Sequence, residues 1–428
     1  MCRKEWFQVC FKIISLFLLC GWAIYGGDLQ NTRYKNLSFN CQNLKIIWKF
    51  KPEKHIFRYS PFTNIWSTPV AGTINGKTFI YIGFYDYNLY CIDLKTGKEI
   101  WRFTSGNKII SSPVFFKINE KYLVSFASRD RRIYCLDAET GQRLWTYEVY
   151  PWRYTVQEAI PSSGIFIPEL GNLYFTIYIC DKKPFKTVEE AVVIALTWKG
   201  ELVWKKKIKN AGILSSPCYA RLNNKHFLFI SSSNGNLYAV SAENGKILWT
   251  VTLGDKTYAT PSVLKLEDKI IIYIGDKFGY LYALDEKGKI IWKFKTGHFI
   301  DTSAAILNGK KPKVYITSFD RKLYCLDALV GRKIFEFETH NYLYSSPLIV
   351  KIRDKRCVIF SSLDNTIFIL DAENGSLIEK IKLGKRIFPY ETYGETIWPS
   401  PIVVQSSAKT CLIYPSTEGI LFCLGCNS

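Results

Sequence analysis

One short phrase recurs along the whole chain and restricts the available folds more than any other feature. An apolar stretch is followed by Tyr-Cys-Leu-Asp or a variant, then by Thr-Gly-Lys, and then by Trp. Copies span 89–101, 133–145, 192–204, 237–249, 281–292, 323–335 and 367–379. An eighth copy begins at Ile420 and runs into the C-terminus. Although 428 residues alone would suggest two or three domains, this period indicates a repeat protein instead.

A second motif, Ser or Thr before Pro, precedes an apolar stretch between successive copies of the phrase. It stands at Thr68, Ser112, Ser216, Thr260, Ser346 and Ser400, with Ser162-Ser163 and Ser303-Ala304 in the two other places. Alternating apolar residues indicate strands, and a period of ~40–50 residues is typical of propeller blades with four short strands each. We therefore expect an all-β fold, an eight-bladed β-propeller of four-stranded antiparallel blades.

The two ends of the chain are expected to complete one blade together. The last copy of the phrase lacks the strand that carries Trp, whereas a spare strand at 44–50 precedes the first blade and has Trp48 in the Trp position. We expect this strand to pair with residues 419–424 and to close the ring, so that no end blade keeps an unpaired inner edge. The single propeller would then occupy residues 24–428.

These motifs resemble the PQQ-enzyme-like propeller family, whose docking phrase is Ala-x-Asp-x-x-Thr-Gly-Lys-x-x-Trp, and the resemblance extends from Trp22 onward. The copy at 91–101 matches with Cys91 for Ala, and the copy at 135–145 also has Gln142 for Lys. In the family these residues lock neighbouring blades together. The resemblance implies this blade-docking role for Trp48, Trp101, Trp145, Trp204, Trp249 and Trp292.

The resemblance leaves the activity open, because the family includes quinoprotein alcohol dehydrogenases as well as the non-enzymatic propeller lipoprotein of the outer-membrane β-barrel assembly machine. The enzymes use a vicinal Cys-Cys ring, Glu and Asn ligands to calcium, and a catalytic Asp. This chain has no Cys-Cys pair, and its four histidines stand at no ligand spacing. We assign no catalytic residue, metal or cofactor. The leading interpretation is a binding scaffold; the alternatives are a PQQ- and calcium-dependent oxidoreductase with a degenerate site and a ligand-sensing propeller.

Three long connections between blades carry aromatic residues together with arginine. They span 51–66, 149–159 and 384–398, and all three are expected on one face of the propeller. Tyr, Trp and Arg dominate the hot spots of protein interfaces. The candidate partner-binding residues are Phe57, Arg58, Tyr59, Trp152, Arg153, Tyr154, Arg386, Tyr390 and Tyr393. The same aromatic residues would equally serve as a roof over the central channel.

Charge and the N-terminus bear on partners and location. The net charge of +20 favours binding to a partner with an acidic protein surface. The lysines form no run of five, and we expect no nucleic-acid partner. We also expect the ring to be monomeric. Arg3 and Lys4 precede an apolar stretch at 13–24, which resembles a secretory signal and is shorter than the ~20 residues of a membrane span. Residues 1–23 are expected to be a signal-like or anchor segment of a periplasmic or exported protein. Leu19 before Cys20 disfavours lipidation.

We predict a disulfide between Cys41 and Cys426, which would clip the closing blade. Both residues align with the repeat position of Leu94, so that the two chain ends bring a cysteine to one turn. A bridge needs Cα atoms roughly 4.4–6.8 Å apart, and it would imply an oxidising compartment. The alternative is two unrelated terminal cysteines among the thirteen in the chain. Non-reducing peptide mapping of native protein should recover the linked peptides, whereas thiols at both positions would refute the bridge.

Overall fold

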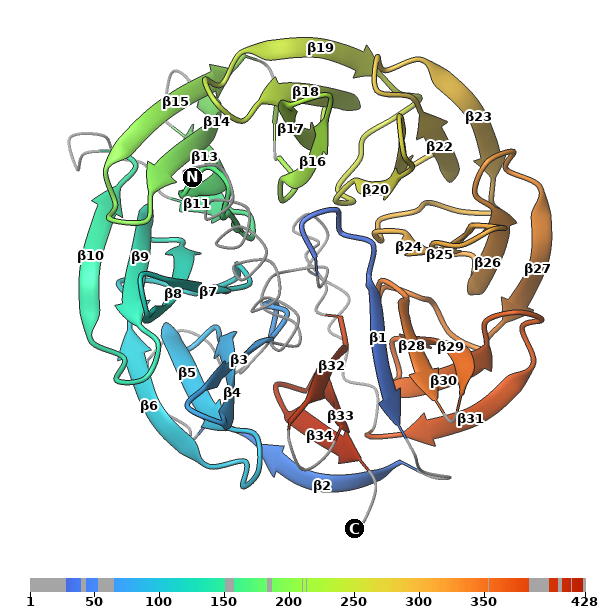
Figure 1. Ribbon diagram of the computed structural model, residues 1–428, viewed down its shortest axis with the longest axis horizontal. Helices are drawn as coiled ribbons and strands as arrows, with labels where there is room; N and C mark the ends of the chain where they lie inside the picture. Colours follow the sequence, from blue (N-terminus) through green and yellow to red (C-terminus); the bar gives the residue numbers. More distant parts are fainter. Residues whose placement is uncertain are drawn as a thin grey trace, which may run out of the picture.

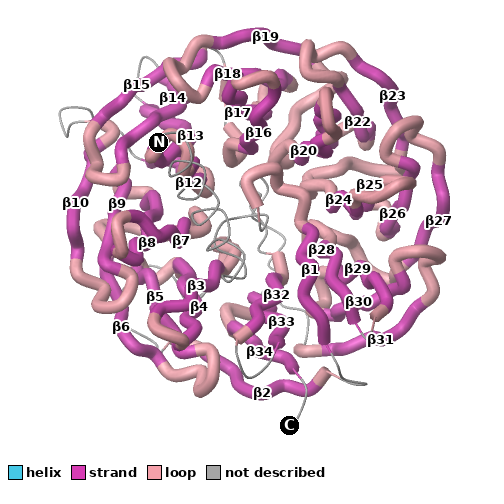
Figure 2. Tube along the Cα trace, in the orientation of Figure 1, coloured by secondary structure: helices cyan, strands magenta, loops and turns pink. Residues whose placement is uncertain are grey.

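The computed structural model describes residues 28–39, 44–52, 65–150, 158–182, 187–209, 211–212, 214–352, 354–384, 400–406, 410–416 and 418–425. Eight sheets stand around a central axis like the blades of a propeller (Figures 1 and 2). The described residues form strands, turns and loops, and they contain no helix long and apolar enough to cross a bilayer. The prediction of an all-β, eight-bladed propeller is confirmed.

The first four blades follow one another along the chain, each running from an inner strand at the axis to an outer strand at the rim. Blade 1 contains β3 (Val70–Ile74), β4 (Lys77–Gly83), β5 (Asn88–Asp93) and β6 (Glu99–Thr104). Blade 2 contains β7 (Val114–Ile118), β8 (Lys121–Ser128), β9 (Arg132–Asp137) and β10 (Arg143–Glu148). Blade 3 contains β11 (Glu158–Pro161), β12 (Ile165–Ile167), β13 (Asn172–Lys182), β14 (Thr187–Thr197) and β15 (Leu202–Ile208). Blade 4 contains β16 (Cys218–Leu222), β17 (Lys225–Ser231), β18 (Asn236–Ser241) and β19 (Ile247–Thr252).

The second four blades include the two that recruit N-terminal strands. Blade 5 contains β20 (Ser262–Lys265), β21 (Ile270–Gly275), β22 (Tyr280–Leu284) and β23 (Ile290–Lys295). Blade 6 contains β24 (Ala305–Leu307), β25 (Lys313–Thr317), β26 (Lys322–Asp327) and β27 (Lys333–Glu338). Blade 7 contains β28 (Leu348–Ile352), β29 (Lys355–Ser361), β30 (Thr366–Asp371) and β31 (Leu377–Lys382), with β1 (Tyr34–Phe39) added. Blade 8 contains β32 (Ile402–Gln405), β33 (Thr410–Pro415), β34 (Leu421–Gly425) and β2 (Lys45–Phe50).

The burial of each strand follows from its place in the blade. Inner and middle strands lie between two neighbouring blades, and β5, for example, is buried along most of its length. Outer strands have one face in solvent, so that β6 and β19 alternate between partly buried and exposed residues. Cys91 and Cys135 occupy the third strand and are fully buried, as a small residue at a close-packed position should be. The apolar clusters therefore lie between the blades rather than at the axis.

The ring is closed by the N-terminal strand. In blade 8, β2 pairs in antiparallel fashion with β34, and Trp48 lies opposite Cys423 in the register. The chain thus supplies three strands of this blade from its C-terminal end and the outer strand from its N-terminal end (Figure 1). The predicted pairing is confirmed, and every blade has an outer strand. Cys41 and Cys426 lie outside the described residues, as does the segment 1–23.

Seven of the eight outer strands dock on the next blade through an aromatic ring that lies on a glycine. The exception is β31 of blade 7, where Glu379 occupies the position of the ring. The ring of Trp48 packs on Gly97, whose φ of +71° and missing side chain allow the approach, because a Cβ there would lie 2.6 Å from the ring. The Trp48 indole nitrogen also donates to the carbonyl of Leu94 at 2.8 Å. The same contact joins Trp101 with Gly141, Trp145 with Gly200, Trp204 with Gly245, Trp249 with Gly288, Trp292 with Gly331 and Phe335 with Gly375.

The Ser/Thr-Pro motif forms a belt of hydrogen bonds around the axis. The backbone N–H of Thr68 donates to the hydroxyl of Ser112, and the N–H of Ser112 donates to that of Ser163. The same hydrogen bond from N–H to hydroxyl, at 3.0–3.2 Å, joins Ser163 to Ser216, Ser303 to Ser346, Ser346 to Ser400 and Ser400 back to Thr68. Within the described residues the belt thus joins seven blades directly, and it is interrupted only at blade 5.

The segment 28–34, which belongs to the predicted propeller, fills this interruption, although the sequence did not predict its contacts. Its backbone carbonyls at 29, 30, 32 and 33 accept N–H groups from the inner strands of blades 4, 5, 6 and 7 at 2.7–2.9 Å. At blade 5 the side-chain amide of Asn31 donates to the carbonyls of Thr260 and Pro261. The chain then continues as β1, which pairs in parallel with β28 and gives blade 7 a fifth strand.

We predict that Asn31 is a major support of this segment. Asn31→Gly keeps the positive φ of 51° accessible but removes the amide donor, and two buried carbonyls lose a partner. The free energy of unfolding in urea should fall by about 1–3 kcal/mol. Asn31→Ala should cost roughly 1 kcal/mol more because of backbone strain.

Asn119 provides the matched control, because it also has a positive φ, of 46°, but lies exposed in a turn. Asn119→Gly should change the free energy of unfolding by less than about 0.5 kcal/mol. Equal effects of the two glycine substitutions would show that the side chain of Asn31 contributes nothing.

Candidate functional site: an aromatic and lysine-bearing face

We define the upper face of the propeller as the face that carries two kinds of segment. These are the connections from each outer strand to the next blade and the turns between the second and third strands. Backbone hydrogen bonds join them: the N–H of Phe319 donates to the carbonyl of Phe299, and the N–H of Lys277 to that of Lys256. The carboxylate of Asp130 likewise accepts the N–H of Gly106 at 2.7 Å. Each turn is thereby held against the connection that precedes its blade.

The nine predicted partner-binding residues belong to connections of this type but lie outside the described residues. They are Phe57, Arg58, Tyr59, Trp152, Arg153, Tyr154, Arg386, Tyr390 and Tyr393. The strands that lead into the three connections, β2, β10 and β31, are all outer strands. The connections therefore begin on the upper face, and their candidate residues remain a prediction.

A stack of aromatic rings lies on the upper face above blades 5 to 7. Phe319 lies between Phe299 and Tyr342, with ring centroids 4.2 Å apart on both sides and interplanar angles of 17° and 2°. Tyr344 meets Phe319 edge-on at 4.6 Å, and His298 meets Phe299 at 4.6 Å. Tyr342 remains 40% exposed. The rings come from two connections and one turn, so they fix these segments relative to one another and also present aromatic surface to solvent.

A lysine extends this stack toward blade 4. The ammonium of Lys277 lies 3.9 Å from the ring centroid of Phe299 and 5.2 Å from that of Tyr258. It also forms an ion pair with Asp301, whose side chain is only 2% exposed. Burial raises the pKa of the Asp301 carboxyl above its ordinary value, and the neighbouring ammonium opposes this effect. The exposed ring of Phe278, at 55%, directly follows Lys277 in the same turn.

Aromatic rings and lysines also meet on the upper face at blades 1 to 3. Trp66 and Tyr85 lie 5.3 Å apart, and the ammonium of Lys108 is 4.6 Å from the centroid of Tyr85. The ammonium of Lys205 lies 3.8 Å from the centroid of Tyr150. Trp66 ends one of the three long connections and Tyr150 lies at the start of another. The described ends of two predicted partner-binding loops thus carry aromatic rings, one in contact with a second ring and one in contact with a lysine.

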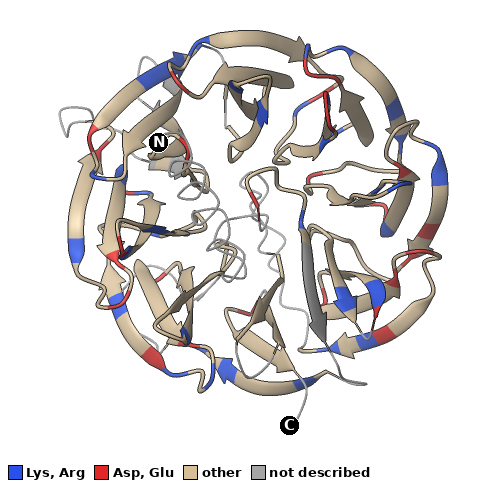
Figure 3. Ribbon diagram, in the orientation of Figure 1, with Lys and Arg blue, Asp and Glu red and all other residues tan. Residues whose placement is uncertain are grey.

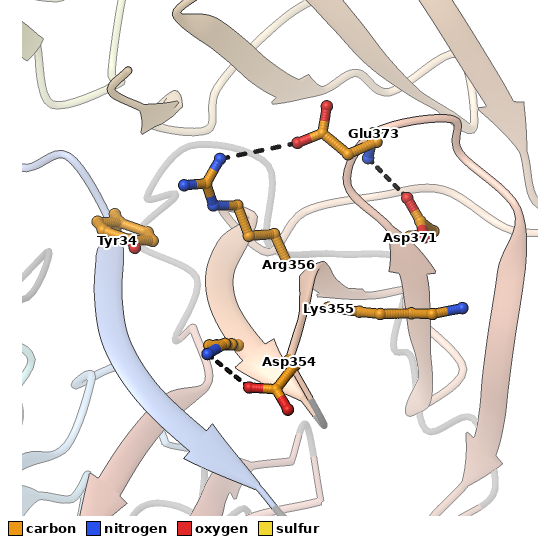
Figure 4. A pocket seen from close by; sticks show the side chains of 7 residues that line it. Tyr34, Asp354, Lys355, Arg356, Asp371 and Glu373 are labelled. Carbon is orange, nitrogen blue, oxygen red and sulfur yellow. Dashed lines mark hydrogen bonds and ion pairs between the residues drawn. The ribbon is translucent and has the colours of Figure 1, made fainter. Parts of the chain in front are cut away.

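The opposite, lower face carries a groove of about 520 Å³ between β1 and blade 7 (Figure 4). Its charged residues pair with one another, as Arg356 with Glu373 at 3.9 Å and Lys351 with Asp354 at 2.7 Å. Tyr34 closes one side (Figure 4). Elsewhere the basic residues are distributed around the rim with acidic ones between them (Figure 3). The groove is therefore a polar seam where the N-terminal strand meets blade 7.

The cysteine, histidine and acidic side chains of the described residues bear on whether a metal or quinone site could form. They contain no group of three or more His, Cys, Asp or Glu side chains arranged for a metal ion. The described cysteines are buried, and burial raises the pKa of the Cys357 thiol to about 11 and those of Cys91 and Cys135 still further. These thiols are poor nucleophiles. Together with the absence of a Cys-Cys pair from the sequence, the residues do not fit the PQQ and calcium site of the quinoprotein enzymes.

The aromatic stack is not predicted from the sequence, because length singles out only the three long connections. Phe299 and Tyr342 lie in short connections, and Phe319 lies in a four-residue turn, so none of them stands out by length. A usable signal was present, since the short segments 298–299 and 342–344 are unusually rich in aromatic residues. Their meeting depends on the ring, which brings three segments from consecutive blades together.

Comparison with protein families gives one extended match. The sequence model of the family described as outer membrane protein assembly factor BamB matches residues 42–166, 189–276 and 277–378. These matched segments contain most of the repeats that form the ring.

Two curated proteins show weaker similarity. The chain is 22% identical over 255 residues to the beta-alanine-activating enzyme of Drosophila melanogaster, which covers 52% of this chain and 25% of that enzyme. It is 25% identical over 207 residues to the uncharacterized protein RC0314 of Rickettsia conorii, which covers 45% of this chain and 42% of that protein. The chain thus spans well under two thirds of the length of either relative.

Solved structures share the fold at low sequence identity. A europium-containing methanol dehydrogenase superposes with a TM-score of 0.67 at 13% identity and covers 95% of this chain and 98% of its own. Quinohemoprotein alcohol dehydrogenase from Comamonas testosteroni gives 0.71 at 12% identity, with 94% and 80% covered. BamB from Moraxella catarrhalis gives 0.60 at 13% identity, with 90% and 100% covered. These similarities establish the propeller fold alone.

We predict that Lys277 and Asp301 stabilise the upper face as a pair. Lys277→Met keeps the aliphatic stem but leaves the Asp301 carboxylate buried without its cation. This should lower the free energy of unfolding by about 3 kcal/mol. The double variant Lys277→Met with Asp301→Asn removes both charges and should be less destabilised than the single variant.

The exposed pair of Lys322 with Glu336, 2.7 Å apart, is the control. Lys322→Met should destabilise the protein much less than Lys277→Met, because solvent screens such exposed pairs. Urea denaturation gives the free energy of unfolding of each variant. A double variant no more stable than Lys277→Met would contradict the pairing of Lys277 with Asp301.

Proposed function

Because the chain belongs to the family described as outer membrane protein assembly factor BamB, we propose that it is a non-catalytic binding propeller that holds a protein partner on its upper face. The ring provides a rigid platform, and its connections provide the variable surface. Binding residues of rigid folds are commonly placed on such loops. The family description also supports a location in the periplasm or at the outer membrane.

The proposal is carried by one observation, the concentration of aromatic rings and lysines on the upper face. Phe278 and Tyr342 are exposed rings above blades 5 to 7; Tyr342 is held by its stack on Phe319, and Phe278 follows Lys277 in the same turn. Aromatic side chains anchored in this way lose little conformational freedom on binding, and they are the residue type that dominates interface hot spots.

The long connections would extend this surface across blades 8, 1 and 3. Their arginines, Arg58, Arg153 and Arg386, add positive charge to a chain whose net charge is +20. Complementary potentials favour an acidic partner and accelerate encounter with it. We therefore propose an acidic protein surface as the binding counterpart, engaged by Tyr59, Trp152 and Tyr390 as aromatic anchors.

Capture of partners from a detergent-solubilised membrane fraction tests the proposal. The reversal of Arg58, Arg153 and Arg386 to Glu should weaken capture, because it opposes an acidic partner. Single Ala variants of Tyr59, Trp152, Tyr390 or Phe278 should each cost about 2 kcal/mol of binding free energy where the residue is a hot spot.

The matched control reverses three exposed lysines of the lower face, Lys95, Lys199 and Lys246, to Glu. It makes the same change in net charge but should leave capture unaltered. Loss of capture only in this control would move the binding site to the lower face. Turnover of alcohols or sugars that depends on added PQQ and calcium would replace the binding proposal with the oxidoreductase alternative.

A further inference from the structure

One turn on the lower face departs from the pattern of the repeat. The turns between the third and outer strands carry polar pairs in blades 1, 2, 4, 5 and 7, such as Lys95-Thr96, Glu139-Thr140 and Glu373-Asn374, and blade 3 has Trp198-Lys199 there. In blade 6 the same two positions are Leu329 and Val330. Val330 is 64% exposed, more than any other large hydrophobic residue that the structure describes, and Leu329 is 40% exposed.

The local structure of this turn does not favour a valine at position 330. The hydroxyl of Thr96 donates to Asp93 at 2.8 Å, and that of Thr140 donates to Asp137 at 2.9 Å. Val330 has the shape of threonine without the hydroxyl, so only its backbone N–H reaches Asp327, at 3.2 Å. Val330 is thus an exposed apolar residue that lacks the side-chain hydrogen bond made at this position in other blades. Such a departure from the local pattern, with no stabilising contact in return, is common at functional sites.

Further aliphatic residues surround this turn. It lies on the outer strand of blade 5, because Gly331 packs on the ring of Trp292 and the Trp292 indole nitrogen donates to the carbonyl of Ala328 at 3.1 Å. That strand, β23, exposes Ile290 and Ile291 by 40% and 47%. Ile334 on β27 is 42% exposed. The junction of blades 5 and 6 therefore carries five exposed aliphatic side chains, which we call the rim patch: Ile290, Ile291, Leu329, Val330 and Ile334.

The charges beside the rim patch are mainly positive and available. Lys310, Lys311 and Arg332 are exposed, and within the described residues none of them forms an ion pair. The nearby carboxylates are already engaged: Asp327 accepts the N–H groups of the turn, and Glu336 pairs with Lys322 and Lys333. A partner that covers the patch must therefore be negatively charged where it meets these cations.

We propose that the rim patch is a membrane-contact site that inserts Leu329 and Val330 among the headgroups of an anionic bilayer. Apolar side chains buried at the headgroup level and cations attracted to anionic lipid both contribute to peripheral membrane binding. The two residues project from a tight convex turn, which suits a deformable lipid surface better than a pocket on a protein. The patch lies on the face opposite the proposed partner-binding surface, and the assignment does not depend on that proposal.

The test uses the full chain in a flotation assay with protein-free vesicles, either of phosphatidylcholine alone or of phosphatidylcholine and phosphatidylglycerol. Wild type should bind the anionic vesicles more strongly. The variant Leu329→Glu with Val330→Thr writes the blade 2 turn, Asp137–Gly141, into blade 6, a sequence that this fold already accommodates. It should lower the partition coefficient for anionic vesicles about tenfold, since it removes the apolar insertion and adds a negative charge.

The reciprocal variant, Glu139→Leu with Thr140→Val, is the control for apolarity at an equivalent turn, and it should not reduce binding. Lys310→Gln with Lys311→Gln should weaken binding to anionic vesicles about tenfold and reduce its dependence on salt. Unchanged partition of the Leu329 and Val330 variant would overturn the proposal. Loss of self-association in light scattering, with vesicle binding intact, would instead assign the patch to contact with a second copy of the chain.

Hydrogen exchange on the wild-type chain provides a readout that does not depend on any variant. Vesicles should slow exchange in peptides that span 327–334 and leave those that span 137–145 in blade 2 unaffected. Equal protection of both turns, or protection of neither, would contradict a contact through blade 6. Because the vesicles contain no protein, these outcomes are independent of whether a partner binds the upper face.

Discussion

The contact between one blade and the next is the interaction on which the rest of the structure depends. No blade buries its apolar residues by itself, since the clusters lie between sheets. Two devices make the contact specific: an aromatic ring on a glycine at the rim and an N–H bonded to a hydroxyl near the axis. The glycine accepts the ring because it has no side chain, and the hydroxyl satisfies a buried N–H that would otherwise be costly. A repeat that keeps both contacts can therefore pack against its neighbours in the same way around most of the ring.

A closed ring adds a constraint that a linear array of repeats does not have, because its last contact joins the two ends of the chain. The strand β2 supplies Trp48 to blade 8 and thereby docks that blade on blade 1. The segment 28–34 bridges blades 4 to 7 from inside, where the hydroxyl belt is interrupted. Residues 28–39 and 44–50 thus contact six of the eight blades directly and close the ring, so these two segments act as part of the core.

This rigid construction separates the two faces of the molecule. The upper face collects the connections between blades, whose lengths vary and whose aromatic residues stack across blade boundaries, as Phe299, Phe319 and Tyr342 do. The lower face consists of short turns that the repeat specifies closely, so a departure such as Val330 is easily recognised. With a partner bound to the upper face and a lipid surface in contact with the lower rim, the ring would hold the partner close to the membrane.

The sequence by itself determined the architecture, because the period, the Trp and Gly positions and the incomplete last copy are local patterns that recur. It was sufficient to predict eight blades and the pairing of β2 with β34. Only the tertiary structure decided the role of Asn31 and the stack around Phe319, because those contacts join residues from different blades that no local pattern relates. The exposure of Val330 likewise depends on the ring, which buries one side of each outer strand and leaves the turn beside it in solvent.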